Sequence, residues 1–141
     1  TEARSHGPVQ GILHGAGVEV AKPLDRKSDE LYQATFGGKV DGLVHLLAET
    51  ASDPLTHVVG FGSVSGRFGG HGQVDYAMAN EALVGVLAAY RAAHPGRAVT
   101  SMSWAAFSEV GLAARSSAKT FLEQSGQAFM TPAVGARHLL R

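Results

Sequence analysis

The sequence predicts an α/β domain built on a doubly wound parallel sheet. Three short apolar runs alternate along the chain with segments of helical periodicity, in the order β-α-β-α-β-α-α. Strands that alternate with helices form parallel sheets with helices packed on their faces. Three strands make a thin sheet, since doubly wound domains usually have more. We therefore expect residues 1–141 to form one domain that is the C-terminal half of a doubly wound fold.

The first half of the chain supplies two strands and one helix. The first strand is predicted within residues 8–17, where an apolar run ends in Gly-Ala-Gly. A helix begins after Ser28, an N-cap residue that is followed by two acidic residues. Its apolar positions recur with helical spacing and are Leu31, Phe36, Val40, Leu43, Leu46 and Leu47. The second strand is predicted within residues 55–63, directly before a loop rich in glycine and serine.

The second half supplies a long helix, a third strand and two short helices. The long helix lies within residues 73–96 and ends at a His-Pro-Gly stop signal. Its apolar face consists of Ala77, Ala79, Leu83, Val86, Leu87 and Tyr90. The third strand is predicted at 97–104, and further helices at 116–126 and 131–141. Thr131 is the expected N-cap of the last helix, because proline follows it in the first turn.

Composition argues against several classes of function. The formal net charge is zero, so there is no basic footprint for nucleic acid. No apolar run approaches the roughly 18 residues of a membrane span, and the polar start lacks a signal peptide's apolar core. The chain has no cysteine, which excludes disulfides and suits a reducing cytoplasm. None of the seven histidines forms an HExxH motif, so we expect no metal site.

Four polar residues are expected to meet at one edge of the sheet. Tyr76 and Asn80 are four apart on a helix and share one face, while Ser63 ends a strand and Lys39 lies on the preceding helix. A phenol has a pKa of about 10, which a nearby cation would lower. Tyr76 could then protonate a carbonyl oxygen as hydride reaches its carbon, with Ser63 donating a second hydrogen bond. Asn80 could position the lysine or hold a water in a proton relay.

The spacing of these residues resembles that of the ketoreductase domains of polyketide synthases and of related polyunsaturated fatty acid and enediyne synthases. These domains belong to the short-chain dehydrogenase/reductase superfamily, whose fold is Rossmann-like. Tyr76 follows Ser63 by thirteen positions, Asn80 follows Tyr76 by four, and Lys39 precedes Ser63 by twenty-four in a KVxG context. Ordinary superfamily members carry a lysine where Asn80 stands. This exchange of lysine and asparagine is typical of the synthase-borne reductases.

The resemblance implies an enzyme that uses NADPH to reduce a β-keto thioester carried on acyl carrier protein. Tyr76 would be its general acid, Ser63 the carbonyl donor, Lys39 the cation and Asn80 the relay partner. The segment GILHGAGV is similar to the family's HxAG turn, and SWAAFSEVGLA is similar to its tryptophan-containing segment below the lid. The cofactor-binding residues implied by these two segments are Gly15, Ala16, Gly17, Trp104 and Ala105. For Trp104, which follows a strand, packing in the core is the favoured alternative to ligand contact.

The same resemblance implies where the substrate would bind. The implied substrate-binding residues are Ser65, Phe68, Gln73 and Phe107. Gln73 matches a family glutamine three residues before the tyrosine, although a helix-start role is an equal alternative. His71 either lines the substrate entrance or is a solvated loop residue. Apolar residues near the C-terminus are interpreted as lid packing or as neighbours of the acyl chain, namely Phe121, Leu122 and Phe129.

Two fingerprints of product stereochemistry are missing. Val18-Glu19-Val20 stands where one class carries an acidic LDD motif, and Phe68 stands where the other carries tryptophan. The stereochemistry of the product is therefore left open, with a lean away from the LDD class.

Two other functions remain as alternatives. The chain has no GxGxxG loop opening a helix, so it could be a non-catalytic scaffold or a fragment that needs a partner segment, namely the upstream cofactor-binding half of the same synthase. The presence of all four residues argues against a decayed domain. A reductase of a free small ketone is the third possibility, which the lysine–asparagine exchange disfavours.

Overall fold

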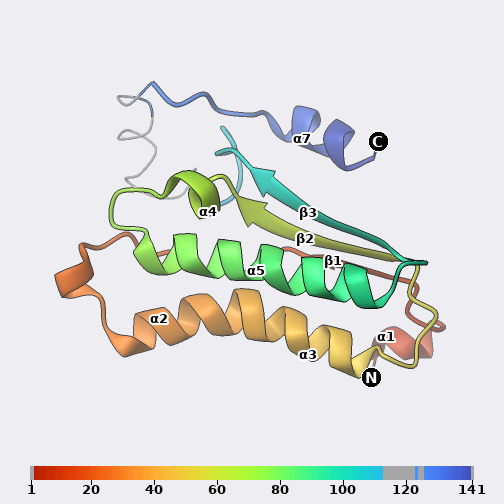
Figure 1. Cartoon of the computed structure of the whole chain (residues 1–141). Helices are drawn as coiled ribbons and strands as arrows, with labels where there is room; N and C mark the ends of the chain where they lie inside the picture. The colour runs from red at the N-terminus through yellow and green to blue at the C-terminus, as the bar shows by residue number, and fades with distance from the viewer. Residues whose placement is uncertain (1, 113–122, 124–125, 141) are drawn as a thin grey trace. The chain divides into compact units, whose positions relative to one another are not determined.

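The computed structural model describes residues 2–112, 123 and 126–140. They divide into two compact units, Thr1–Ser103 and Trp104–Arg141. A three-stranded sheet consists of β1 (Gly11–His14), β2 (His57–Ser63) and β3 (Ala98–Trp104) in the order β1-β2-β3, and all of it except Trp104 lies in the first unit. β1 and β2 are parallel, with Gly11 opposite His57 and His14 opposite Gly60, and the arrows of β2 and β3 run the same way in Figure 1. The parallel α/β architecture predicted from the sequence is confirmed.

Three helices pack together beside this sheet (Figure 1). They are α2 (Asp29–Phe36), α3 (Gly42–Glu49) and α5 (Val74–Ala93). The core between helices and sheet consists of Ile12, Leu43, Leu47, Leu55, Val58, Leu83, Leu87 and Val99. Burial alternates along β1, so that Ile12 is buried while the next residue, Leu13, is 66% exposed. The helices therefore cover the face of β1 that carries Ile12.

The helix predicted after Ser28 begins as expected. The Ser28 side chain accepts a hydrogen bond from the backbone N–H of Leu31, which confirms the N-cap. The helix is not α-helical throughout, however, because a π-helical turn at Gly37–Asp41 lies between α2 and α3. One predicted apolar position after this turn, Leu46, is 42% exposed, whereas Leu43 and Leu47 beside it are buried as predicted.

Several short elements were not predicted. They are the helices α1 (Glu2–Ser5) and α4 (Ser65–Phe68) and a 3₁₀ turn at Leu24–Arg26. Each is a single turn, too short for hydrophobic periodicity to indicate it. Among the described residues, no helix is long and apolar enough to cross a membrane.

The second unit contains α7 (Pro132–Leu139), which begins as predicted. The Thr131 side chain accepts a hydrogen bond from the N–H of Val134, and proline occupies the first turn. Within this unit the rings of Trp104 and Phe107 lie 5.6 Å apart, and a Cβ added at Gly135 would lie 2.6 Å from the Phe107 ring. The helix predicted at 116–126 falls largely outside the described residues, as do Phe121 and Leu122.

Candidate active site

Lys39 is buried in the middle of the π-helical turn, with 4% of its surface exposed. Its Nζ donates a 2.9 Å hydrogen bond to the carbonyl of Phe61 on β2. The backbone carbonyl of Lys39 in turn accepts a 2.8 Å hydrogen bond from His14 Nε2, at the end of β1. A Cβ on Gly17 would lie 3.1 Å from the Lys39 Cε, so glycine there leaves room for the lysine. Burial lowers the pKa of Lys39 from the usual 10.5 to about 8.

Tyr76 lies in the first turn of α5 and is half-buried. Burial raises the pKa of its phenol, hydrogen bonds with the side chains of Ser63 and Asn80 oppose that rise, and the charge of Glu19 adds to it. The Lys39 Nζ lies 5.8 Å from the centre of the Tyr76 ring, within the range of a cation–π contact. Lys39, Ser63 and Asn80 therefore gather around this tyrosine, at the carboxyl end of β2.

One sequence-based expectation about this tyrosine is wrong. Lys39 was expected to lower the phenol pKa of Tyr76, yet burial raises that pKa. The reason is geometric: the lysine Nζ faces the ring and is bonded to the carbonyl of Phe61. Burial also disfavours the charge of Lys39 itself, which weakens it as a source of positive potential.

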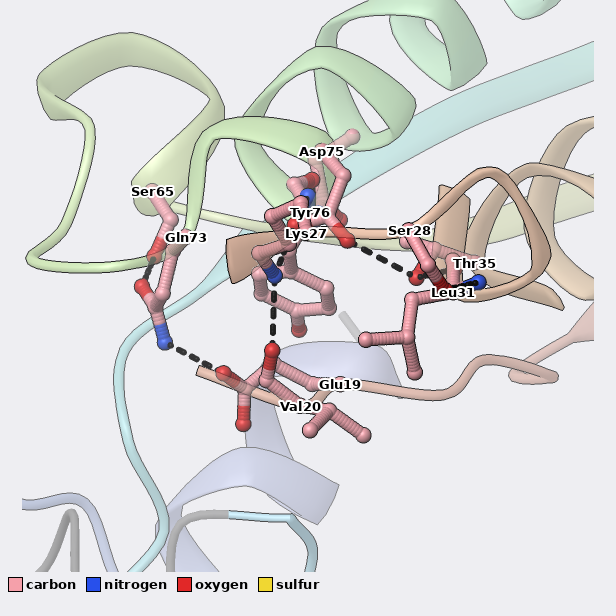
Figure 2. A network of polar contacts seen from close by, with 11 residues as sticks. Glu19, Val20, Lys27, Ser28, Leu31, Thr35, Ser65, Gln73, Asp75 and Tyr76 are labelled. Atoms are coloured by element: carbon pink, nitrogen blue, oxygen red, sulfur yellow. Dashed lines mark hydrogen bonds and ion pairs between the residues drawn. The ribbon is translucent and has the colours of Figure 1, made fainter. Parts of the chain in front are cut away.

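A chain of hydrogen bonds runs from Ser63 across the loop before α5. Ser63 Oγ accepts from the N–H of Ser65 at 3.1 Å and donates to Ser65 Oγ at 3.2 Å. Ser65 Oγ donates to Gln73 Oε1 at 3.1 Å, and Gln73 Nε2 donates to Glu19 at 3.3 Å; these last two bonds are drawn in Figure 2. Ser65 and Gln73, which the resemblance assigns to substrate binding, thus connect the candidate carbonyl donor Ser63 to a carboxylate.

Asn80 is 1% exposed and binds the backbone of Tyr76. Its Nδ2 donates a 2.7 Å hydrogen bond to the Tyr76 carbonyl, one helical turn earlier. Its Oδ1 is buried and has no hydrogen-bond partner among the described residues. Asn80 also packs against α4, where a Cβ added at Gly66 would lie 3.2 Å from the Asn80 Cβ. A buried acceptor without a partner beside Tyr76 is suited to a bound donor such as a water.

The predicted cofactor-binding turn follows β1. Gly15 lies against the ring of Phe61, since a Cβ there would be 3.4 Å away, and Gly17 lies against Lys39. Ala16 between them is exposed. The turn therefore presents open backbone next to the candidate lysine.

The other predicted ligand contacts belong to the second unit or to exposed surface. Trp104, Ala105, Phe107 and Phe129 are half-buried residues of the second unit, and their ligand roles stay predictions. The ring contact between Trp104 and Phe107 favours the packing interpretation for this tryptophan. Phe68, on α4, is 87% exposed.

A shallow cleft of about 530 Å³ lies beside the loop before α5. Its lining comes from two segments and from the first turns of α5, and includes Lys22, Leu24, His71, Gln73, Ala77 and Met78. The segments are joined by a hydrogen bond from the Lys22 N–H to the Gly72 carbonyl at 3.0 Å. His71 and Gln73 both line this cleft, and an entrance role for His71 stays a prediction.

Sequence reasoning missed an ion pair at the start of α5. Lys27 Nζ lies 2.6 Å from Asp75 Oδ1, with side chains that are 7% and 4% exposed (Figure 2). The sequence does not indicate this ion pair, because Lys27 simply precedes a helix cap and Asp75 has the place of an ordinary acidic residue in the first turn of a helix. The role of Glu19 beside Gln73 was missed for a similar reason, since Glu19 was noted only as part of an absent fingerprint.

Comparisons with known proteins place the chain among synthase proteins. Residues 1–109 match the KR domain family. Polyketide synthase GfsA of Streptomyces halstedii is 35% identical over 132 residues, which cover 92% of this chain and 2% of that synthase. A polyunsaturated fatty acid synthase protein of Thraustochytrium sp. is 44% identical over 82 residues, which cover 58% of this chain and 3% of that protein.

Solved structures agree with these relatives. A ketoreductase domain from the bacillaene assembly line superposes with a TM-score of 0.82 and 30% identity, covering 98% of this chain and 35% of that chain. The first ketoreductase of the tylosin PKS superposes with a TM-score of 0.79 and 31% identity, covering 99% and 30% respectively. A short-chain dehydrogenase/reductase of Brucella melitensis, at a TM-score of 0.67 and 22% identity, shares the fold.

The sheet and the helices beside it therefore have the Rossmann-like architecture of short-chain dehydrogenases and reductases. Within that class, the chain belongs to the KR domain family, the ketoreductase domains of polyketide synthases. It spans 2–3% of the first three curated relatives and about a third of the solved ketoreductase chains named above.

Proposed function

We propose that this chain is the catalytic part of a ketoreductase that reduces a β-ketoacyl thioester, carried on acyl carrier protein, to the β-hydroxyacyl thioester. The observation that carries the proposal is the gathering of Lys39, Ser63 and Asn80 around Tyr76 at the carboxyl end of β2. Open α/β sheets bind ligands at this edge. Membership of the KR domain family supports the same reaction.

Each residue of the set has a distinct task in this proposal. Tyr76 donates its phenolic proton to the substrate carbonyl oxygen, a form of general acid catalysis that contributes about 10²–10⁴-fold. The raised pKa of Tyr76 keeps the phenol protonated at neutral pH. Ser63 turns its hydroxyl toward the same oxygen, where negative charge develops. Lys39, with a pKa of about 8, is mostly charged at neutral pH, and its Nζ lies 5.8 Å from the centre of the Tyr76 ring.

Asn80 completes the site by orienting a water that can return a proton to Tyr76. Its Oδ1 is buried and lacks a partner among the described residues, so it can accept a hydrogen bond from a water next to the tyrosine. Its Nδ2 is held by the Tyr76 carbonyl, which fixes the direction in which Oδ1 points. The asparagine therefore acts by orienting a proton donor.

NADPH would supply the hydride. The residues present fit one end of this cofactor, because the backbone of the turn at Gly15, Ala16 and Gly17 is open next to Lys39. We propose that Lys39 and this turn hold the nicotinamide end, while Trp104 and Ala105 stay predicted cofactor contacts. The diphosphate-binding glycines would come from an upstream half of the same synthase. On this view residues 1–141 are one C-terminal portion of the catalytic domain.

The relatives named above are a polyketide synthase and a fatty acid synthase protein, so the proposed partner is an acyl carrier protein that bears the β-ketoacyl chain. Ser65, Phe68, Gln73 and Phe107 are proposed to contact that chain. A cytoplasmic location stays a prediction.

The test is NADPH oxidation with a β-ketoacyl N-acetylcysteamine thioester or trans-1-decalone. The chain would be assayed alone, joined to its native upstream sequence, and in that longer form with Tyr76→Phe. We expect activity in the longer form and its loss in Tyr76→Phe, by at least about 10²-fold. Tyr32→Phe is the matched control, because Tyr32 stacks on Phe36 of α2 and lies outside the set around Tyr76. A longer form that binds NADPH but reduces no ketone would instead support a non-catalytic scaffold.

A further inference from the structure

The ion pair between Lys27 and Asp75 is the most buried of those that the described residues form. Its side chains are 7% and 4% exposed, against 36% and 8% for Arg4–Asp53 and 64% and 44% for Arg67–Glu81. Burying two opposite charges is unfavourable unless their remaining hydrogen-bonding capacity is satisfied. The contacts of this pair show how that is achieved.

The contacts of the pair tie two other segments, residues 20–27 and α2, to the start of α5. Lys27 Nζ donates to Asp75 Oδ1 and to the Val20 carbonyl, both at 2.6 Å. Asp75 Oδ2 accepts from Thr35 Oγ1 of α2 at 3.4 Å. Asp75 Oδ1 also accepts from the backbone N–H of Tyr76 at 2.8 Å. Figure 2 shows Lys27 and Asp75 next to Tyr76, with Thr35 to one side and Val20 below.

Asp75 replaces a missing helix cap. The N-cap residue of α5, Gln73, makes no side-chain capping bond, because its amide is used by Ser65 and Glu19. The Asp75 carboxylate instead accepts the N–H of Tyr76, one of the first-turn donors that a helix leaves unsatisfied. The carbonyl of Tyr76 is bound by Asn80. Side chains therefore hold both polar backbone groups of the candidate general acid.

We propose that Lys27 and Asp75 are positioning residues for Tyr76. Asp75 fixes the backbone of the tyrosine, and Lys27 fixes Asp75 while fastening the segment that carries Glu19 alongside it. The inference rests on the proposed function, because it assigns the pair to the placement of the proton donor in that reaction. Misplacement of a reacting group by about 1 Å can cost about 10²-fold in rate, so even a small shift is measurable.

The alternative is a purely structural role, for which the chain offers a control. Arg4 and Asp53 also join two segments, and Asp53 Oδ1 accepts from the N–H of Val9. Val9 and Asp53 precede β1 and β2, so this second pair lies at the amino ends of the strands, away from Tyr76. Loss of the Arg4–Asp53 pair should reduce stability alone.

The test compares Lys27→Met, Lys27→Arg, Lys27→Met/Asp75→Asn and Arg4→Met in the protein that includes the native upstream sequence. We expect Lys27→Met to lower kcat by about 10- to 100-fold with the KM for NADPH little changed. Lys27→Arg should recover most of the loss, since it keeps the charge. The double variant removes both charges, so it leaves no orphaned buried carboxylate if Lys27→Met fails to fold, and it should still lower kcat. Arg4→Met should lower the melting temperature and leave kcat unchanged.

A second readout follows Tyr76 without relying on turnover. In protein labelled with ¹³Cζ-tyrosine, Lys27→Met should move the Tyr76 resonance and its titration, whereas Arg4→Met should not. If Lys27→Met loses stability but retains both kcat and the Tyr76 signal, the pair is structural and the inference is overturned. If the wild type binds NADPH but reduces no thioester, the reductase function is wrong. If Lys27→Met still shifts the Tyr76 resonance in that case, the positioning of Tyr76 by the pair stands.

Discussion

The buried lysine makes a prediction about stability whose sign depends on pH. Burial lowers the pKa of Lys39 to about 8 from the usual 10.5. The folded protein then binds fewer protons at this site than the unfolded chain between those two values, so stability rises with pH across that window. The full shift corresponds to about 3 kcal/mol of destabilisation at neutral pH. Integrating the linkage relation, about 2 kcal/mol of it is relieved between about pH 7 and pH 9.5.

Reversible urea unfolding of the wild type and of Lys39→Met, across that pH range, measures the effect. Methionine has similar length and no charge, so it lacks the pH-dependent contribution. The wild type should gain about 2 kcal/mol relative to Lys39→Met as the pH rises to about 9.5. The comparison stops there because the raised phenol pKa of Tyr76 contributes with the opposite sign at higher pH. A difference between the two proteins that stays constant, or falls with pH, would refute the desolvation of Lys39.

Two further predictions concern the site's charge and the sheet–helix contact. Glu19→Gln should lower the pKa of Tyr76, because the Glu19 carboxylate raises it. The alkaline limb of the pH profile of kcat should therefore move to lower pH. Glu19→Asp keeps the charge and should leave this limb in place. Gly60→Ala should destabilise the fold by about 1–3 kcal/mol in urea unfolding, because the new Cβ would lie 2.5 Å from Leu87 Cδ1. Gly85→Ala, with nothing within 4 Å of its Cβ, should stabilise the protein by about 0.5–1 kcal/mol, and equal effects of the two changes would contradict the packing argument.

The fold was largely predictable because its signals are local. The three strands and α5 lie where apolar runs and helical periodicity indicated, and both predicted caps, Ser28 and Thr131, make their expected hydrogen bonds. The π turn around Lys39 was not predictable, since a single extra residue in a helix leaves almost no trace in periodicity.

The site was predictable only in part for a different reason. The spacing of Ser63, Tyr76 and Asn80 is a sequence feature, and these residues do meet. Lys27 and Asp75 are 48 positions apart in the sequence, and they pair only because a loop folds back onto a helix. The direction in which the pKa of Tyr76 shifts depends on burial of its side chain, and residue spacing does not predict that burial.

A lysine at position 39 and an asparagine at position 80 fit this site because of three neighbouring residues, which are His14, Gly17 and Gly66. A lysine at position 39 must reach Phe61 from the preceding helix, and it does so through a π turn whose carbonyl is bound by His14.

Glycine at position 17 gives the lysine its space, since a Cβ there would lie 3.1 Å from Lys39 Cε. Asn80, being short and neutral, can bond back to the carbonyl of Tyr76 while α4 approaches closely at Gly66. A side chain without an amide group at position 80 would lose that bond. A variant with Asn80→Lys and Lys39→Asn therefore should not be active. It would lose both the bond from Asn80 to the Tyr76 carbonyl and the bond from Lys39 to the Phe61 carbonyl.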